Sequence, residues 1–254
     1  MEAMDILDQN HISSENMYNA FVVACKEGNL PLVNWMMDMP GKIDIPIPDD
    51  EEEETYSCYT LGFWFACQRS HLKIVNRLLD IQQHDLLNVD ALIKDTDVSP
   101  FSSHSLPPGS KTTAFFEACL QGNSDVVQRL LELPGGTINF EAVGPVNEDT
   151  ENEDGTGFMA ACSLGHLTVV KLLLQLPKGS INIQAEDLDG YNGFMNACSK
   201  GHLSVVKSFL ELPQGRFNVD ETNKDGETGL EIAVRKGHLV VEAAIRQYKR
   251  DRSE

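Results

Sequence analysis

Residues 156–183 read TGFMAACSLGHLTVVKLLLQLPKGSINI, and residues 192–219 read NGFMNACSKGHLSVVKSFLELPQGRFNV. The two stretches begin 36 residues apart, and their shared cysteine also has counterparts elsewhere in the chain. The complete column is Cys25, Cys67, Cys119, Cys162, Cys198 and Val234. Successive members are 42, 52, 43, 36 and 36 residues apart. A recurring period of this size is the signature of a stacked repeat protein. The sequence therefore predicts six units that cover nearly the whole chain.

Each unit contains two predicted helices. Residues 158–162 are helix formers, and Gly165 suits the left-handed conformation that closes a helix. The second helix has apolar residues on one face, namely Leu167, Val170, Leu173 and Leu174. It stops at Pro177, and an extended segment and a turn at 186–190 follow. One unit is thus helix, tight turn, helix, and then a projecting hairpin or loop.

These units resemble the ankyrin repeat. The resemblance rests on the Gly-His turns at 165–166, 201–202 and 237–238, on the LxVVKxxL helix, and on NKDGETGLEIAVRKGHL at 223–239. It implies an all-α, ankyrin-type helix-turn-helix solenoid of about six repeats with hairpin or loop fingers. The units depart from the family in being longer and in two motif positions. The motif proline is replaced by Gly157, Gly193 and Gly229, and its histidine by Met159, Met195 and Glu231. We expect apolar packing to replace the polar network that this histidine makes in the family.

The predicted repeats begin near residues 16, 60, 113, 156, 192 and 228. Residues 1–15 are expected to form a leader or partial cap, 16–246 the solenoid, and 247–254 a charged tail. Loop insertions are expected near 46–59, 91–112 and 143–155. In the last unit, Glu242 and Arg246 replace apolar residues of the fifth unit, which suits the polar outer face of a terminal cap.

The composition limits the classes of partner. Thirty-nine acidic residues against 20 basic ones give a net charge of -19, which argues against nucleic acid and anionic membranes as partners. The longest apolar runs are too short to span a bilayer, and no signal region is apparent. Five of the six cysteines share one column and indicate small buried side chains in a reducing compartment, whereas Cys58 lies outside it. We expect a cytoplasmic monomer, with the nucleus as the alternative location.

The Cys and His residues raise the question of a metal or catalytic site. Cys67 and His71, Cys162 and His166, and Cys198 and His202 recur as pairs. Zinc ligands must lie within about 4 Å of one another, whereas neighbouring helices pack about 10 Å apart. We therefore expect the cysteines in the core and the histidines bordering the second helices, with no metal, cofactor or catalytic residue. An ankyrin-scaffold enzyme or metal-binding protein that uses the Cys and His residues is the alternative.

Comparison of the units separates columns that vary little from columns that vary freely. The column of Phe21 and Phe63 is uniformly large and apolar and predicts core, whereas the column two residues on is variable and predicts a free surface. The variable column consists of Val23, Phe65, Glu117, Ala160, Asn196 and Ile232. Phe65 is either an exposed aromatic anchor or is buried by the neighbouring insertion.

The resemblance to ankyrin proteins implies that a protein or peptide partner lies in a concave groove lined by free columns and finger tips. Six units at about 10 Å each give a groove on the order of 60 Å long. The predicted binding residues are Phe65, Arg69, Gln121, Leu164, Leu188, Asp189, Tyr191, Lys200, Lys224, Asp225, Arg235 and Lys236.

Charge and asparagine patterns complete the prediction. Acidic loops at 49–54 and 148–154, with Glu186, Asp187 and Asp189, predict acidic fingers beside a basic floor at Lys200, Arg235 and Lys236. We therefore expect a partner with a basic segment, unless the acid serves only solubility. The resemblance further implies that Asn139, Asn182 and Asn218 tie the fingers to the backbone, and some such asparagines in the family are hydroxylated.

Overall fold

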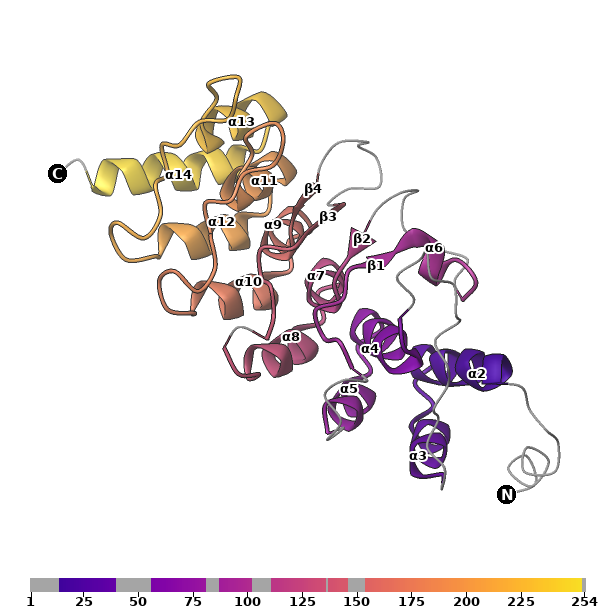
Figure 1. The fold of residues 1–254 in the computed structure, drawn as a ribbon. Coiled ribbons are helices and arrows are strands. Elements are labelled where there is room, and N and C mark those ends of the chain that lie inside the picture. The colour runs from indigo at the N-terminus through magenta and orange to yellow at the C-terminus, as the bar shows by residue number, and fades with distance from the viewer. Residues whose placement is uncertain are drawn as a thin grey trace.

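The structure is a computed structural model of the chain. It describes residues 14–39, 56–80, 87–101, 111–135, 137–145 and 154–252. The described residues form two layers of helices that stack side by side, with the two ends of the chain at opposite ends of the stack (Figure 1).

Each unit contributes one helix to each layer. The first helices are α2 (Ser14–Lys26), α4 (Cys58–Gln68), α7 (Ala114–Leu120), α9 (Gly157–Ser163), α11 (Gly193–Lys200) and α13 (Gly229–Lys236). The second helices are α3 (Leu30–Asp38), α5 (Leu72–Leu79), α8 (Ser124–Leu131), α10 (Leu167–Leu174), α12 (Leu203–Leu210) and α14 (Leu239–Asp251). Within each layer, every helix packs on the helix of the next unit. The all-α solenoid predicted from the sequence is confirmed.

Tight turns join the two helices of a unit. Gly165 has φ of 75°, a left-handed conformation that a residue without Cβ adopts at little cost, and the His166 N–H closes the turn by donating to Ala161 O at 2.9 Å. Unit two places Ser70 in the corresponding turn, with φ of 62°. The first helices begin at side-chain caps, such as Thr156, whose hydroxyl accepts from the Met159 N–H.

We call the segment that precedes each first helix a finger and number it with its unit. Finger three pairs β1 (Ile93–Lys94) with β2 (Lys111–Thr112) and contains α6 (Asp95–Val98), and finger four pairs β3 (Val143–Pro145) with β4 (Asp154–Thr156). Both pairs are antiparallel. Fingers five and six are shorter and are closed by single bridges between Glu186 and Asn192 and between Thr222 and Thr228.

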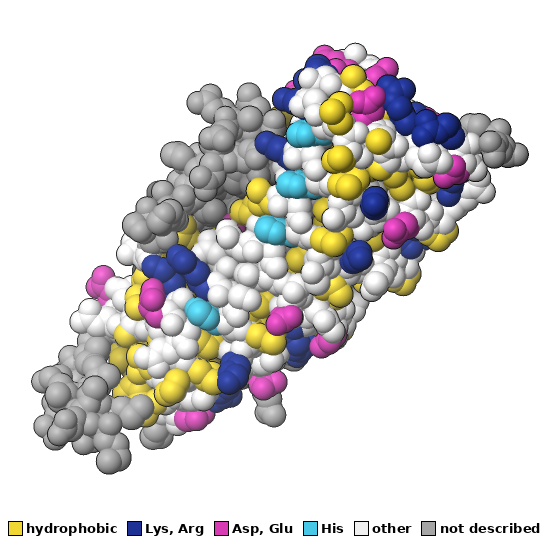
Figure 2. All heavy atoms as spheres, turned by 180° about the vertical axis from the view of Figure 1, so that it is seen from behind, with side chains coloured by type: hydrophobic (Ala, Val, Ile, Leu, Met, Phe, Trp, Pro, Cys, Tyr) yellow, Lys and Arg dark blue, Asp and Glu magenta, His cyan; other side chains and the backbone are white. Residues whose placement is uncertain are grey.

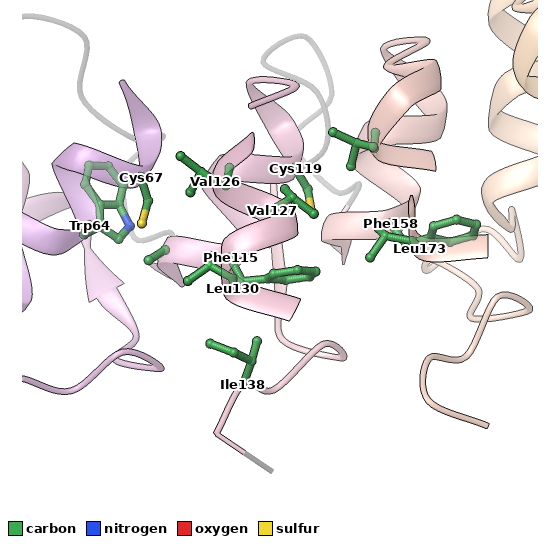
Figure 3. Packing of buried hydrophobic residues seen from close by; sticks show 14 of the residues in the cluster. Trp64, Cys67, Phe115, Cys119, Val126, Val127, Leu130, Ile138, Phe158 and Leu173 are labelled. Carbon is green, nitrogen blue, oxygen red and sulfur yellow. The ribbon is translucent and has the colours of Figure 1, made fainter. Parts of the chain in front are cut away.

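The core lies between the helix layers and repeats from unit to unit. The column of phenylalanines and the column of cysteines are buried throughout units one to five. Figure 3 shows Trp64 and Cys67 from α4, Phe115 and Cys119 from α7, and Phe158 from α9 following one another along the stack. Cys58, which the repeat pattern left without a role, is also buried in this core, at the start of α4.

Glycine at the motif-proline position has a packing reason. A Cβ on Gly193 would lie 3.0 Å from Cys162 Sγ, and a Cβ on Gly229 would lie 2.6 Å from Phe194 Cε1. The phenylalanine and cysteine of one unit therefore occupy the space that a side chain at the glycine of the next unit would need. At the motif-histidine position, Met159 and Met195 are buried, as expected. The expectation is wrong for Glu231, which is exposed and accepts from the Thr228 N–H at 2.7 Å in a capping box.

The C-terminal unit differs in two ways from the sequence expectation. Helix α14 continues to Asp251, so residues 247–251 are helical rather than part of a tail. Arg246 Nε and Glu242 Oε1 lie 2.9 Å apart on the outer face, but Val234, Leu239 and Val240 are 46, 73 and 62 % exposed. The end of the stack is therefore polar in one part and apolar in another.

Candidate protein-recognition surface

The variable column that was predicted to be free is mostly buried. Phe65 and Glu117 are 0 and 1 % exposed, Ala160, Asn196 and Ile232 are also buried, and only Val23 is exposed, at 44 %. The prediction of a free column is therefore wrong for five of its six members. Phe65 packs against Phe101, from the insertion before α7, with ring centroids 6.2 Å apart. It is covered by that insertion and is not an exposed anchor.

Two residues of this column contact a residue of similar polarity at the end of the preceding first helix. Gln68, at the end of α4, donates from Nε2 to Glu117 Oε2 at 3.1 Å, so a polar residue in unit two matches a polar residue in unit three. Leu120, at the end of α7, packs on the cluster that contains Ala160, so an apolar residue in unit three matches an apolar residue in unit four. Glu117 and Ala160 thus each match the residue of the preceding unit that packs against them, and neither faces solvent.

Glu117 is an ionisable group inside this layer. Its Oε2 accepts from Gln68, whereas its Oε1 has no hydrogen-bond partner among the described residues. Burial is the largest influence on its pKa and raises the pKa above the usual glutamate value, although the polar side chains around it, with Gln68 first among them, act in the opposite direction. A buried carboxylate with one unsatisfied oxygen destabilises the folded state when it is charged.

The exposed surface lies at the ends of the first helices, four residues after the variable column. We call the last or cap residue of each first helix the exposed line, and it consists of Glu27, Arg69, Gln121, Leu164, Lys200 and Lys236. All six are exposed, and Leu164 is an apolar member at 43 % exposure. Five of the predicted binding residues therefore lie on one line that crosses units two to six.

Most of the other predicted residues meet at fingers five and six. The Lys224 backbone N–H donates to Asp189 O at 3.1 Å, and its Nζ donates to Leu188 O at 2.5 Å. These bonds fasten finger six to finger five. Leu188 is left 60 % exposed, and Asp189 and Asp225 are also exposed.

Arg235 connects these fingers to helix α13. Its Nε and Nη2 donate to the two carboxylate oxygens of Glu227 at 2.7 and 2.8 Å, and Nη2 also donates to the Tyr191 hydroxyl at 3.2 Å. The bond from Arg235 is the largest influence on the Glu227 carboxyl and lowers its pKa. The structure therefore brings together Leu188, Asp189, Tyr191, Lys224 and Arg235, next to Asp225.

The predicted acidic loops are only partly visible. Residues 49–54 and 148–153 lie outside the described residues, and Asp154 lies in β4. In finger five, Asp187 has a local role, because its Oδ1 accepts from the backbone N–H groups of Asp189 and Tyr191 at 3.0 and 2.8 Å. Glu186 and Asp189 are exposed and leave the tip of this finger acidic.

The histidines form a ladder that the sequence reasoning did not predict. Each ring Nε2 lies 2.8–2.9 Å from a backbone oxygen of the preceding unit and, because a carbonyl only accepts, carries the hydrogen of this bond. The four pairs are His71 with Lys26, His166 with Leu120, His202 with Ser163, and His238 with Ser199. Figure 2 shows these histidines in a row along one face of the stack. The signal was the repeated Gly-His turn.

The cysteines do not share this surface. All six thiols are free and buried, and burial raises their pKa, in the case of Cys58 to about 12. The raised pKa disfavours the thiolate that nucleophilic attack and metal binding require. In unit three, which has asparagine in place of this histidine, Asn123 Nδ2 donates to Cys67 O and Gln68 O, both at 2.8 Å. Histidine and asparagine thus serve the same purpose of holding adjacent units together.

The three predicted asparagines make local backbone ties. The Oδ1 atoms of Asn139, Asn182 and Asn218 each accept from the backbone N–H two residues later at 3.1 Å. The Asn182 N–H also donates to Glu141 Oε1 of the preceding unit, at 2.8 Å. The expected tie is present, and all three asparagines are exposed.

Comparison with known proteins bears on units two to six of the solenoid. The sequence model of one family, described as ankyrin repeats (3 copies), matches residues 63–187 and 158–249. No curated protein matches the chain. In the part of the chain that the structure describes, no helix has the length and apolar character needed to cross a membrane.

Proposed function

The chain belongs to the ankyrin-repeat family, and we propose that it is a non-catalytic module that recognises a protein or peptide partner along the exposed line and fingers five and six. Ankyrin repeats are generally protein-interaction modules, and the proteins that contain them are typically non-enzymatic scaffolds. The burial of every thiol, with its raised pKa, supports a non-catalytic role.

The observation that carries this proposal is an exposed leucine in finger five, whose backbone is hydrogen-bonded to finger six. Leu188 is 60 % exposed, and its own carbonyl is held by Lys224 Nζ. Because the backbone of Leu188 is already anchored, less backbone entropy is lost when a partner covers its side chain. Such residues, when surrounded by polar groups, are typical binding hot spots.

The charges around this leucine favour a partner with a basic segment. Glu186, Asp189 and Asp225 are exposed on the two finger tips. Lys200 and Lys236, on the exposed line, can meet an acidic residue of the same partner. Charges at the edge of an interface mainly steer association and lose strength as salt is added.

The test compares two exposed leucines. Partners are captured with the wild-type chain and identified, and their affinity is then measured for Leu188→Ser and for Leu239→Ser, which alters the 73 % exposed leucine at the start of α14, outside the fingers and the exposed line. We expect Leu188→Ser to weaken binding about tenfold and Leu239→Ser to leave it unchanged, since an interface anchor contributes more than about 1 kcal/mol. Equal affinities for the two variants would rule out finger five as the centre of the interface.

A further inference from the structure

A cleft of about 450 Å³ lies between the segments that follow the second helices of three consecutive units. Its lining includes Glu141 from unit three, Lys178 and Asn182 from unit four, and Arg216 from unit five. None of these side chains belongs to the exposed line or to the finger tips. These residues belong to fingers four, five and six, so a ligand site in the cleft goes beyond the partner recognition proposed for the finger tips and the exposed line.

The two cations of the cleft are held in place by backbone oxygens. Lys178 Nζ donates to Gly215 O at 3.2 Å, and Arg216 Nη2 donates to Leu176 O at 2.5 Å. Each bond joins unit four to unit five, so each fixes a charged group across the junction. Within the described residues, neither cation forms an ion pair with a carboxylate. A carbonyl orients a cation without neutralising its charge.

Most hydrogen-bond donors of these two groups remain available. A guanidinium has five N–H donors and an ammonium has three, and the bonds to Leu176 O and Gly215 O use one of each. Arg216 and Lys178 thus retain about six donors between them. Because their heads are already positioned, binding of an anion requires little further ordering of the two side chains.

The rest of the cleft sets limits on the ligand. Ile181 and Ile183 contribute an apolar wall and are 9 and 7 % exposed. Glu141, which also lines the cleft, accepts at Oε1 from the Asn182 backbone N–H at 2.8 Å. This carboxylate disfavours a second negative group, so the cleft suits a ligand with one anionic group and an apolar neighbour.

We propose that this cleft binds a phosphate monoester, with Arg216 and Lys178 as the groups that contact the phosphate. Two positive charges match a dianion, and about six available donors match the three terminal oxygens of a phosphate monoester. A phosphorylated side chain of a peptide and free phosphate share this chemistry. The isoleucine wall gives the peptide an additional contact that free phosphate lacks.

The test follows the Arg216 Nε–H and Asn182 side-chain amide signals by NMR during titration. The probes are inorganic phosphate, the peptide acetyl-Ala-phosphoserine-Ile-amide, and the same peptide without phosphate. We expect saturable shifts with both phosphate probes and none with the unphosphorylated peptide. Tighter binding of the phosphopeptide supports a phosphorylated side chain as the ligand, whereas equal affinities support the site with free phosphate as its ligand.

Variants locate the binding. Arg216→Gln and Lys178→Gln should each weaken phosphate affinity about tenfold or more, because each removes charge-assisted hydrogen bonds. Lys171→Gln, which removes an exposed cation from α10 outside the cleft, should leave the affinity unchanged. Arg216→Lys provides a second variant that keeps the charge if the glutamine variant proves unstable. Shifts that do not saturate, or that persist equally in both glutamine variants, would overturn the proposal.

Discussion

Replacement of Gly201 by alanine tests how the histidine ladder holds the units together. Gly201 closes α11 with φ 77° and ψ 22°, and a Cβ there would lie 2.6 Å from His238 Nδ1 of the next unit. The ring must move, and with it the bond between Nε2 and Ser199 O, which is 2.9 Å long. Gly237 supplies a matched control, because it has the same φ and ψ at the end of α13 but nothing within 4 Å of its Cβ position.

The two variants share one cost and differ in another. A left-handed alanine costs about 1–2 kcal/mol in either place. Gly201→Ala additionally loses the His238 hydrogen bond, which is worth about 1 kcal/mol, and part of the ring packing. We expect losses of unfolding free energy of about 1–2 kcal/mol for Gly237→Ala and about 3 kcal/mol for Gly201→Ala.

The assay is urea unfolding followed by circular dichroism and by tryptophan fluorescence, since a repeat protein can depart from two-state behaviour. The same pair of substitutions is then made with His238→Ala, where the excess loss at Gly201 should disappear. Equal losses at the two glycines in the wild-type background would refute the reasoning, because they would leave only backbone strain and no contribution from the ring.

Three further predictions concern other residues. Glu117→Gln should stabilise the fold by about 1–2 kcal/mol at pH 8. Because burial raises the pKa of Glu117 in the folded state, the wild type loses stability as pH rises from the ordinary glutamate pKa to the raised one. The gain in the glutamine variant should therefore shrink as pH falls towards the ordinary glutamate pKa. Glu211→Gln, which removes an exposed carboxylate, is the control and should change the unfolding free energy by less than about 0.5 kcal/mol at pH 8; all variants are compared by melting over a pH series. Asn182→Ala removes the acceptor of the Gln184 N–H and should lower the unfolding free energy by about 1 kcal/mol in urea unfolding. Asn182→Asp keeps an acceptor and should lower it less. An alanine variant with the wild-type unfolding free energy would contradict a stabilising role for the bond between Asn182 and the Gln184 N–H. Once a partner is known, Asp189→Asn with Asp225→Asn should slow its association and flatten the salt dependence in stopped-flow measurements, and identical salt slopes would assign these carboxylates to solubility alone.

The helices and their order follow from signals within a single unit. The turn glycine and the apolar residues of the second helix lie within a few residues of one another, as Gly165 and the Leu and Val residues of α10 do. These signals predict the helices without information about the neighbouring unit. The end of α14 escaped this reading, because residues 247–251 are charged and resemble a tail, although they continue the helix.

The candidate surface depends on contacts between units and was only partly predictable. Phe65 was open to two interpretations, and its burial depends on Phe101, which lies 36 positions later in an insertion without a repeat pattern. The cleft of Lys178 and Arg216 was not predicted, since its residues come from segments of three units whose approach depends on the stacking itself. The ties of Lys224 and Arg235 to finger five likewise link residues 36 or more positions apart.

Variation between the units of one chain therefore has two physical causes. Residues such as Gln68 and Glu117 vary together because they touch across a junction, and a change in one leaves a buried group without its partner. Residues such as Arg69, which follows Gln68, and Gln121, its equivalent in the next unit, vary because they are exposed. Exposed substitutions usually change stability by less than about 0.5 kcal/mol. The exposed line can thus change its chemistry, and with it the partner that it fits, while the paired layer beneath keeps the stack folded.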